Sequence, residues 1–193
     1  MKENLREDLK MYLISDSDIL KGRDFYKCIE DGLKAGVTML QLREKNADGG
    51  EFLEKALKLR ELTKKYNAKF IIDDRIDIAL LCDADGVHVG QSDIDAKSAR
   101  KLIGEDKILG VSARTLQEAK RAKEDGADYL GIGAMFSTST KLDAKSVSFE
   151  TLKEIKDNVG QLKQFNPDGY AIISAILKEE DIYAEVKKWL DVI

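Results

Sequence analysis

The chain has 193 residues, of which 43% are hydrophobic and 35% are charged, as expected for one globular domain over residues 1–193. No apolar stretch approaches the roughly 20 residues that span a bilayer, and the N-terminus lacks the apolar core of a secretion signal. The formal net charge of -4, with both signs interspersed, argues against a nucleic-acid partner. We therefore expect a cytoplasmic domain without membrane or nucleic-acid partners.

Cysteine and histidine are too few to support several common kinds of site. Cys28 lies among helix-spaced apolar residues and Cys82 ends an apolar run, so we expect buried free thiols rather than a disulfide or metal pair. His88 is the only histidine, which leaves almost nothing from which to build a zinc site or a histidine-based triad. It lies inside an apolar run, and we interpret it as a structural histidine with satisfied hydrogen bonds.

Short apolar runs alternate with amphipathic stretches, a pattern typical of strand–helix units around a parallel sheet. We expect strands at residues 11–15, 37–42, 70–72, 86–89, 108–111 and 129–133. Helical spacing of apolar residues predicts helices around residues 25–33, 52–66 and 76–82. The triplets Ala84-Asp85-Gly86 and Gly126-Ala127-Asp128 resemble one strand-opening turn used twice.

The last part of the chain departs from this alternation of strands and helices. A helix expected near residues 149–155 is followed by residues 158–167, which contain no continuous apolar run where a seventh strand belongs. Residues 170–176, YAIISAI, read as a strand, and apolar residues from Ile182 to Ile193 predict a closing helix. We thus count seven strands where a barrel needs eight.

Polar residues follow the carboxyl ends of the predicted strands, which is where parallel α/β folds bind ligands. Asp74 and Asp93 follow neighbouring strands, so they either share a hard cation such as Mg²⁺ or are solvated loop acids and helix caps. Gln41, Arg43 and Lys45 share one side of a strand end. The two cations there either suit a pyrophosphate or belong to a surface charge run partnered by Glu44.

Two further segments offer donors to an anion. Ser112 follows the fifth strand and is either such a donor or a turn residue. Residues 137–141, Ser-Thr-Ser-Thr-Lys, offer hydroxyl groups, backbone N–H groups and one ammonium, although the same composition also fits a polar turn.

Eight motifs occur in the order found in thiamine-phosphate synthases: YLISD, GVTMLQLREK, IIDDRIDIAL, DGVHVGQSD, GVSARTLQEA, GADYLGIG, STSTK and DGYAIISAI. They run from about Met11 to Ile176, and eight ordered motifs make chance similarity implausible. The chain thus resembles this family of (β/α)₈ TIM barrels. The resemblance implies a transferase that joins a hydroxymethylpyrimidine pyrophosphate to a hydroxyethylthiazole phosphate, giving thiamine phosphate and pyrophosphate.

The resemblance also implies roles for individual residues. Mg²⁺ would bind Asp74 and Asp93. The pyrimidine pyrophosphate would be held by Gln41, Leu42, Arg43, Glu44, Lys45, Asp73, Ser112 and Lys141. The thiazole phosphate would be held by Thr138, Ser139, Thr140, Ile173 and Ser174.

In this family the pyrimidine's carbon–oxygen bond breaks and the thiazole nitrogen captures the resulting cation. Arg43 and Lys141 would therefore be catalytic, because they would stabilise the departing pyrophosphate together with Mg²⁺. Family resemblance also suggests a homo-oligomer.

Three positions depart from the family pattern. Asp73 stands where the family usually has Asn, and Ser137 stands where Pro usually opens the loop. Between Asn158 and Gly160 the family carries an apolar strand and a Gly-Gly turn that are absent here. The chain is either truly shortened or its sequence omits a segment. The well-formed flanking motifs favour an omission, which predicts a spatial break there that one peptide bond cannot span.

Two other functions compete with this interpretation. A thiazole tautomerase would use a histidine after the fifth strand, but Arg114 occupies that place and cannot act as a general base near neutral pH. A catalytically impaired paralogue that binds a phosphorylated ligand is favoured by the missing strand, whereas the retained Asp74, Asp93 and Lys141 argue against it.

Overall fold

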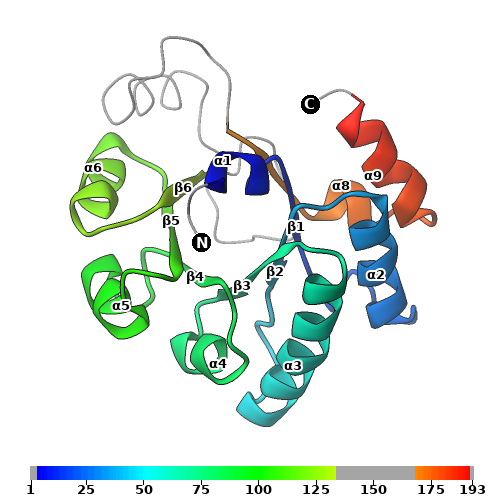
Figure 1. Cartoon of the computed structure of the whole chain (residues 1–193), viewed down its shortest axis with the longest axis horizontal. Helices are drawn as coiled ribbons and strands as arrows, with labels where there is room; N and C mark the ends of the chain where they lie inside the picture. Colours follow the sequence, from blue (N-terminus) through cyan, green and yellow to red (C-terminus); the bar gives the residue numbers. More distant parts are fainter. Residues whose placement is uncertain (1–3, 134–167, 192–193) are drawn as a thin grey trace.

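The computed structural model describes residues 4–133 and 168–191 of the chain. Its parallel strands form one sheet in the order β6-β5-β4-β3-β2-β1-β7, which curves around a common centre (Figure 1). The strands are β1 Met11–Ile14, β2 Met39–Leu42, β3 Lys69–Asp73, β4 Gly86–Val89, β5 Ile108–Ala113, β6 Tyr129–Ile132 and β7 Tyr170–Ile172. The fold is a TIM barrel, as the sequence predicts, and the seven strands of the described residues nearly close it.

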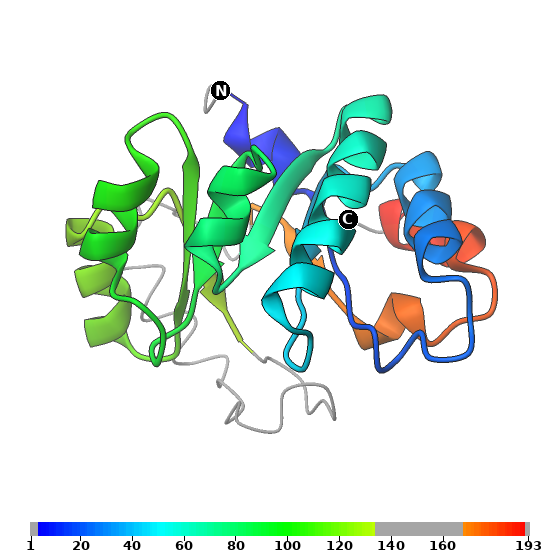
Figure 2. The same ribbon diagram turned by 90° about the horizontal axis from the view of Figure 1, so that it is seen from below.

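Except for the short first helix, the described helices surround this sheet on its outer side, as the two perpendicular views in Figures 1 and 2 agree. Their bounds are α1 Leu5–Asp8, α2 Phe25–Ala35, α3 Gly49–Lys65, α4 Ile76–Leu81, α5 Ala96–Ile103, α6 Leu116–Glu124, α8 Ser174–Leu177 and α9 Ile182–Leu190. Polar N-caps start several of them, including Asp24, Asp48 and Thr115, whose side chains accept backbone hydrogen bonds. Among the described helices, none has both the length and the apolarity to cross a membrane.

The core has two layers, because successive side chains of each strand point to opposite faces. The larger layer packs the sheet against the outer helices and contains Cys28 and Cys82, both buried and free as expected. The smaller layer fills the barrel interior with Tyr12, Ile14, Met39, Ile71 and Ile108. Leu5 and Leu9, at the start of the chain, pack against this interior layer, so α1 covers the end of the barrel where the strands begin.

The repeated strand-opening turn is a repeated ion pair in the structure. Before β4, Asp85 Oδ2 accepts hydrogen bonds from Phe70 N at 2.8 Å and from Arg60 Nη1 at 2.7 Å. Before β6, Asp128 Oδ2 accepts from Leu109 N at 2.8 Å and from Arg100 Nη2 at 2.6 Å. Asp85 thus links the start of β3 to α3, and Asp128 links the start of β5 to α5.

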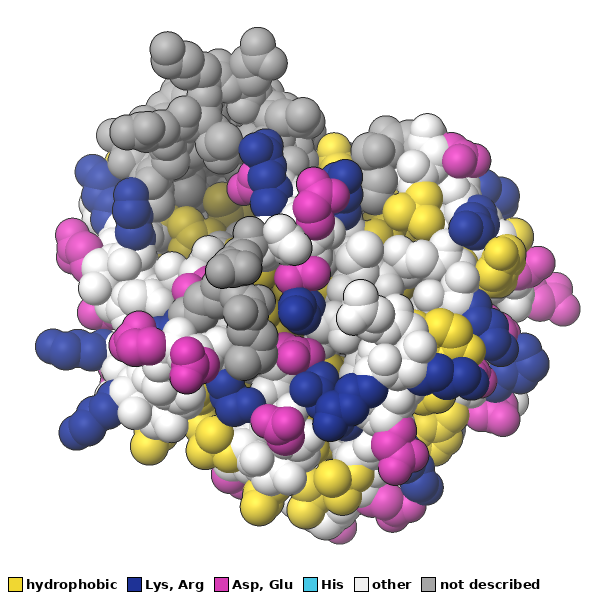
Figure 3. Space-filling view, in the orientation of Figure 1, with side chains coloured by type: hydrophobic (Ala, Val, Ile, Leu, Met, Phe, Trp, Pro, Cys, Tyr) yellow, Lys and Arg dark blue, Asp and Glu magenta, His cyan; other side chains and the backbone are white. Residues whose placement is uncertain are grey.

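On the face of the molecule shown in Figure 3, Lys and Arg side chains are interspersed with Asp and Glu side chains. Large apolar side chains are also exposed on α3, α4 and α5, namely Leu57, Leu80, Leu81 and Leu102. They belong to helices whose opposite faces are buried in the core.

The structure corrects the sequence prediction at residues 170–176. The strand ends at Ile172, and Ser174–Leu177 forms the short helix α8 rather than continuing the strand. Ile173 has φ -119° and ψ -88°, which leaves the extended region, and the fully buried Ile176 and Leu177 then pack as one helical turn.

Among the described residues, β6 and β7 are the two edge strands of the sheet. Within the described residues, β6 pairs only with β5 and β7 pairs only with β1, so each leaves one edge toward the other. The expected helix at 149–155 and the expected break at 158–160 lie outside the described residues.

Candidate active site

The carboxyl ends of β1, β2 and β3 bring together a row of alternating charges. Arg43 Nη1 lies 3.0 Å from Asp16 Oδ2, and Arg43 Nε lies 3.9 Å from Asp73 Oδ2. Lys45 Nζ lies 3.5 Å from the same Asp73 oxygen and also forms an ion pair with Asp74. The predicted convergence of Arg43 and Lys45 is therefore confirmed, and Asp73 lies between them.

The charges in this row perturb one another. Burial alone would lower the pKa of the Lys45 ammonium, but its hydrogen bond to Asp74 and the negative charges of Asp73 and Asp74 raise that pKa overall. Asp16 and Asp73 are both buried, so their carboxylates have little water to stabilise them and depend on the neighbouring cations.

Asp74 and Asp93 lie close enough to influence each other. Burial raises the pKa of the Asp93 carboxyl, and a hydrogen-bonding contact with Asp74 raises it further. Asp93 Oδ2 accepts a hydrogen bond from Gly90 N at 2.8 Å, which fixes it within its own loop. Asp74 has a φ of 61°, a left-handed conformation that is uncommon for a residue with a side chain and is often found at functional sites.

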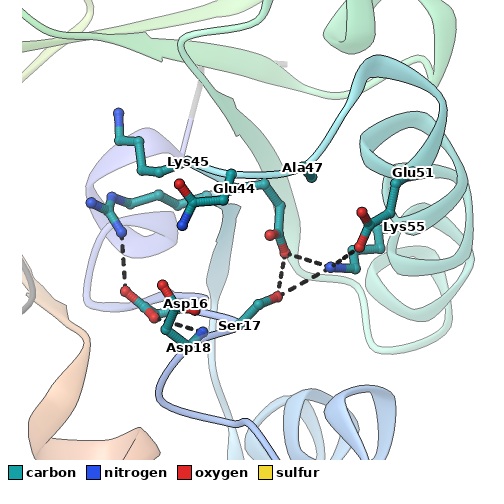
Figure 4. Close-up of a pocket in the computed structure, with 10 residues that line it drawn as sticks. Asp16, Ser17, Asp18, Glu44, Lys45, Ala47, Glu51 and Lys55 are labelled. Atoms are coloured by element: carbon teal, nitrogen blue, oxygen red, sulfur yellow. Dashed lines mark hydrogen bonds and ion pairs between the residues drawn. The ribbon is translucent and has the colours of Figure 1, made fainter.

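Glu44 points away from this charged row, contrary to the alternative in which it partners Arg43 and Lys45. It accepts a hydrogen bond of 2.5 Å from Ser17 Oγ and lies 3.2 Å from Lys55 Nζ, which also contacts Glu51 at 3.0 Å. Figure 4 shows Glu44 turned toward Ser17 and Lys55 while Lys45 extends to the other side. We call Ser17, Glu44, Glu51 and Lys55 the Glu44 brace.

A pocket of about 200 Å³ opens between the charged row and the Glu44 brace (Figure 4). Its walls come from the loop after β1 and from the segment between β2 and α3, and they include Asp16, Arg43 and Lys45. The pocket therefore offers both cations to an anionic ligand on the face where the strands end.

The predicted donors Gln41 and Ser112 belong to the barrel interior. Gln41 Nε2 donates to Tyr12 Oη at 2.6 Å, and Ser112 Oγ lies 2.9 Å from His88 Nε2. His88 is buried and is also hydrogen bonded through Nδ1 to Tyr129 Oη at 3.1 Å, so its interpretation as a satisfied structural histidine is confirmed. Sequence reasoning missed the two tyrosines, because it treated them as ordinary apolar strand residues.

The remaining predicted residues lie in different environments. Leu42 has a fully buried side chain in the outer core layer, so only its backbone can reach a ligand. Ile173 packs against the barrel interior at the start of α8, next to Ser174. Thr138, Ser139, Thr140 and Lys141 lie outside the described residues.

The fold and the site together define a class of protein, namely a TIM-barrel protein that brings paired cations and carboxylates together at its strand ends. The family model of thiamine monophosphate synthase matches residues 11–176. The thiamine-phosphate synthase of Clostridioides difficile is 66% identical, over 97% of this chain and 97% of the relative. The chain therefore belongs to the thiamine monophosphate synthase family.

Solved structures agree with this assignment. The thiamine phosphate pyrophosphorylase of Pyrococcus furiosus superposes with a TM-score of 0.85 and 36% identity, over 97% of this chain and 96% of that one. KGPDC of Streptococcus mutans has a TM-score of 0.64 at 13% identity, a likeness of fold alone. The alignment with the Clostridioides relative spans 203 positions, more than the 193 residues here, so the relative carries residues without a counterpart in this chain.

Proposed function

We propose that this chain is a transferase that forms thiamine phosphate from a hydroxymethylpyrimidine pyrophosphate and a hydroxyethylthiazole phosphate. The observation that carries the proposal is the convergence of Arg43 and Lys45 on Asp73, beside Asp74 and Asp93, in a chain 66% identical to a thiamine-phosphate synthase. The proposal also includes a cytoplasmic location and, from the family resemblance, a homo-oligomer.

Arg43 and Lys45 would bind the pyrophosphate of the pyrimidine substrate. A guanidinium presents a planar pair of donors to phosphate oxygens, and an ammonium adds a compact charge. As the carbon–oxygen bond breaks, negative charge would accumulate on the leaving pyrophosphate, and both cations would stabilise that charge. Lys141, proposed to act with them, lies outside the described residues.

Asp74 and Asp93 suit Mg²⁺, because this cation prefers carboxylate oxygens and leaves positions for water and substrate phosphate. Two neighbouring carboxylates, one with a raised pKa, form a donor set that a divalent cation would stabilise. Among the described residues no cluster of three or more acidic, histidine or cysteine side chains could hold a metal, so substrate and water would complete the coordination. When bound, Mg²⁺ would neutralise charge on the departing pyrophosphate.

The two competing functions receive less support. Arg114 is exposed and its backbone N–H donates to Glu118 at the start of α6, so it offers no general base for a tautomerase. A binding-only paralogue would have less need for two neighbouring carboxylates beside paired cations.

A steady-state assay of thiamine phosphate formation with both substrates and Mg²⁺ tests the proposal. We expect turnover that disappears when either substrate is withheld and falls when Mg²⁺ is chelated. Isothermal titration of Mg²⁺ and of each substrate provides the companion measurement. Binding without turnover would favour the paralogue, and proton exchange on a thiazole without product formation would favour the tautomerase.

A further inference from the structure

A continuous chain of hydrogen bonds crosses the barrel interior between two residues expected to bind substrate. Gln41 Nε2 donates to Tyr12 Oη at 2.6 Å, and Tyr12 Oη lies 2.8 Å from Tyr129 Oη. Tyr129 Oη lies 3.1 Å from His88 Nδ1, and His88 Nε2 lies 2.9 Å from Ser112 Oγ. These five side chains, one each from β1, β2, β4, β5 and β6, form what we call the interior relay.

The donor direction of this relay follows from its first member. An amide nitrogen only donates, so Tyr12 Oη accepts from Gln41. If Tyr129 also donated to Tyr12, the buried Tyr12 hydroxyl proton would have no acceptor among the described residues, which is unfavourable for a buried donor. Tyr12 therefore donates to Tyr129, and Tyr129 donates to His88 Nδ1. A neutral His88 then carries its proton on Nε2 and donates to Ser112 Oγ.

The surrounding structure is fitted to this relay. A Cβ atom on Gly110 would lie 2.1 Å from the Tyr129 ring and 2.6 Å from His88 Nδ1, and one on Gly131 would lie 2.9 Å from His88 Cε1. Glycine at these two strand positions leaves the space that the rings occupy. Burial raises the pKa of both Tyr12 and Tyr129 above the ordinary tyrosine value, so both hydroxyl groups stay protonated and able to donate.

We infer that Tyr129 is a positioning residue that holds His88 in the Nε2–H tautomer, so that Ser112 presents its hydroxyl proton to the ligand and Gln41 presents its carbonyl oxygen. The relay thereby fixes one donor and one acceptor on opposite sides of the site. The ligand part of this inference rests on the proposed function, whereas the direction of the hydrogen bonds does not.

The tautomer can be measured directly, because His88 is the only histidine in the chain. Protein carrying ¹⁵N-histidine and no histidine tag should give one pair of ring nitrogen signals, with Nε2 protonated and Nδ1 acting as an acceptor. Tyr129→Phe keeps the ring but removes the donor, so the Nδ1 signal should move toward that of an acceptor without a hydrogen bond. Tyr183→Phe, on the exposed face of α9, is the matched control and should leave both signals unchanged.

A proton on Nδ1 in the unmodified protein, or an Nδ1 signal unaffected by Tyr129→Phe, would overturn the inference. Should Tyr129→Phe fail to fold, the unmodified protein still decides the matter, because the Tyr129 hydroxyl can donate to Nδ1 only when His88 carries its proton on Nε2. These spectra need no turnover, so they test the relay even if the proposed reaction is absent.

A double-mutant cycle tests whether Tyr129 acts through Ser112. Tyr129→Phe should raise the KM for the pyrimidine pyrophosphate about fivefold, corresponding to the loss of about 1 kcal/mol of binding. In a Ser112→Ala background the same substitution should have almost no further effect, because the hydroxyl that it orients is already gone. Additive effects of the two substitutions would show that Tyr129 acts independently of Ser112 and would overturn this role.

Discussion

The two ends of the barrel hold their charged residues in opposite ways. At the end where strands begin, Asp85 and Asp128 each have one arginine partner and one backbone N–H donor. At the end where strands finish, Asp16, Asp73 and Asp74 share two cations in an alternating row. The first arrangement satisfies each charge within the fold, whereas the second keeps several like charges close together.

This difference separates residues expected to stabilise the barrel from residues proposed to bind a ligand. Buried pairs with complete partners are expensive to break but have little left to offer another molecule. Clustered carboxylates and cations can exchange partners when an anion or a metal ion arrives. Substitutions at one end should therefore change stability, and substitutions at the other should change binding and turnover.

The largest effect is expected at the proposed metal site. Asp74→Ala and Asp93→Ala should each lower kcat/KM by at least about 100-fold while leaving the thermal midpoint nearly unchanged, because each removes a cation ligand rather than core packing. Steady-state assays over a range of Mg²⁺ concentrations would measure this. Full activity of either variant at low Mg²⁺ would show that the carboxylate does not bind the metal.

A large effect on stability, rather than on turnover, is expected at Asp85. Asp85→Ala leaves the mostly buried Arg60 charge without its partner and removes the acceptor for Phe70 N, so unfolding free energy should fall by about 3 kcal/mol. Denaturant unfolding measures this loss, and KM for both substrates should stay unchanged. The exposed Asp106→Ala serves as the control and should change stability by less than about 0.5 kcal/mol. A raised KM in Asp85→Ala would contradict the division between the two ends.

A moderate effect is expected where this chain departs from the family pattern. Asp73→Asn removes a carboxylate that competes with phosphate for Arg43 and Lys45, so KM for the pyrimidine pyrophosphate should fall about fivefold, equivalent to about 1 kcal/mol. Asp18→Asn removes the same charge at the pocket rim, where Asp18 has no ion pair among the described residues. If both variants bind substrate equally well, the effect reflects net charge rather than competition at Asp73.

The smallest effect is expected on the outer helices, away from both ends. Hydrogen bonds from Lys65 and Tyr66 lower the pKa of Glu30 from 4.5 to about 2. A depressed carboxyl pKa stabilises the folded state above the unfolded pKa, and this contribution is lost as pH falls from about 4.5 toward 2. Glu30→Gln should thus slightly lower the thermal midpoint at pH 7, with a difference that shrinks as pH falls through that window. A constant difference across the titration would exclude this cause.

The repeating part of the fold was predictable because its signals are local. Strand cores at residues 86–89 and 108–111 are bounded by turn residues and buried on both faces, so their apolar runs are distinctive. The short helix α1 was not predicted, since one turn of mixed charged residues has no measurable periodicity. The run at 170–176 was assigned to a strand because a short apolar run fits either structure, and packing of Ile176 and Leu177 decided it.

The candidate site was predictable in composition but not in pairing. Strand order placed Arg43, Lys45 and Asp74 on the same face, whereas the direction of Glu44 depends on the distant Ser17 and Lys55. The interior relay had a signal that sequence reasoning did not use. Tyr129 pairs in register with Gly110, which pairs with His88, so period-two alternation across neighbouring strands points these residues into the same interior.

The Glu44 brace has a consequence for the entropy of binding. Immobilising a long side chain on association costs about 0.5–1.5 kcal/mol, and here Glu44 and Lys55 hold the segment after β2 in place before a ligand arrives. Arg43 and Lys45 are likewise already ordered by Asp16 and Asp74. Much of the entropy cost of ordering these side chains is therefore incurred during folding, before a ligand binds. In the proposed function, binding of a pyrophosphate would exchange carboxylate for phosphate oxygens, so the enthalpy of the new contacts would decide the affinity.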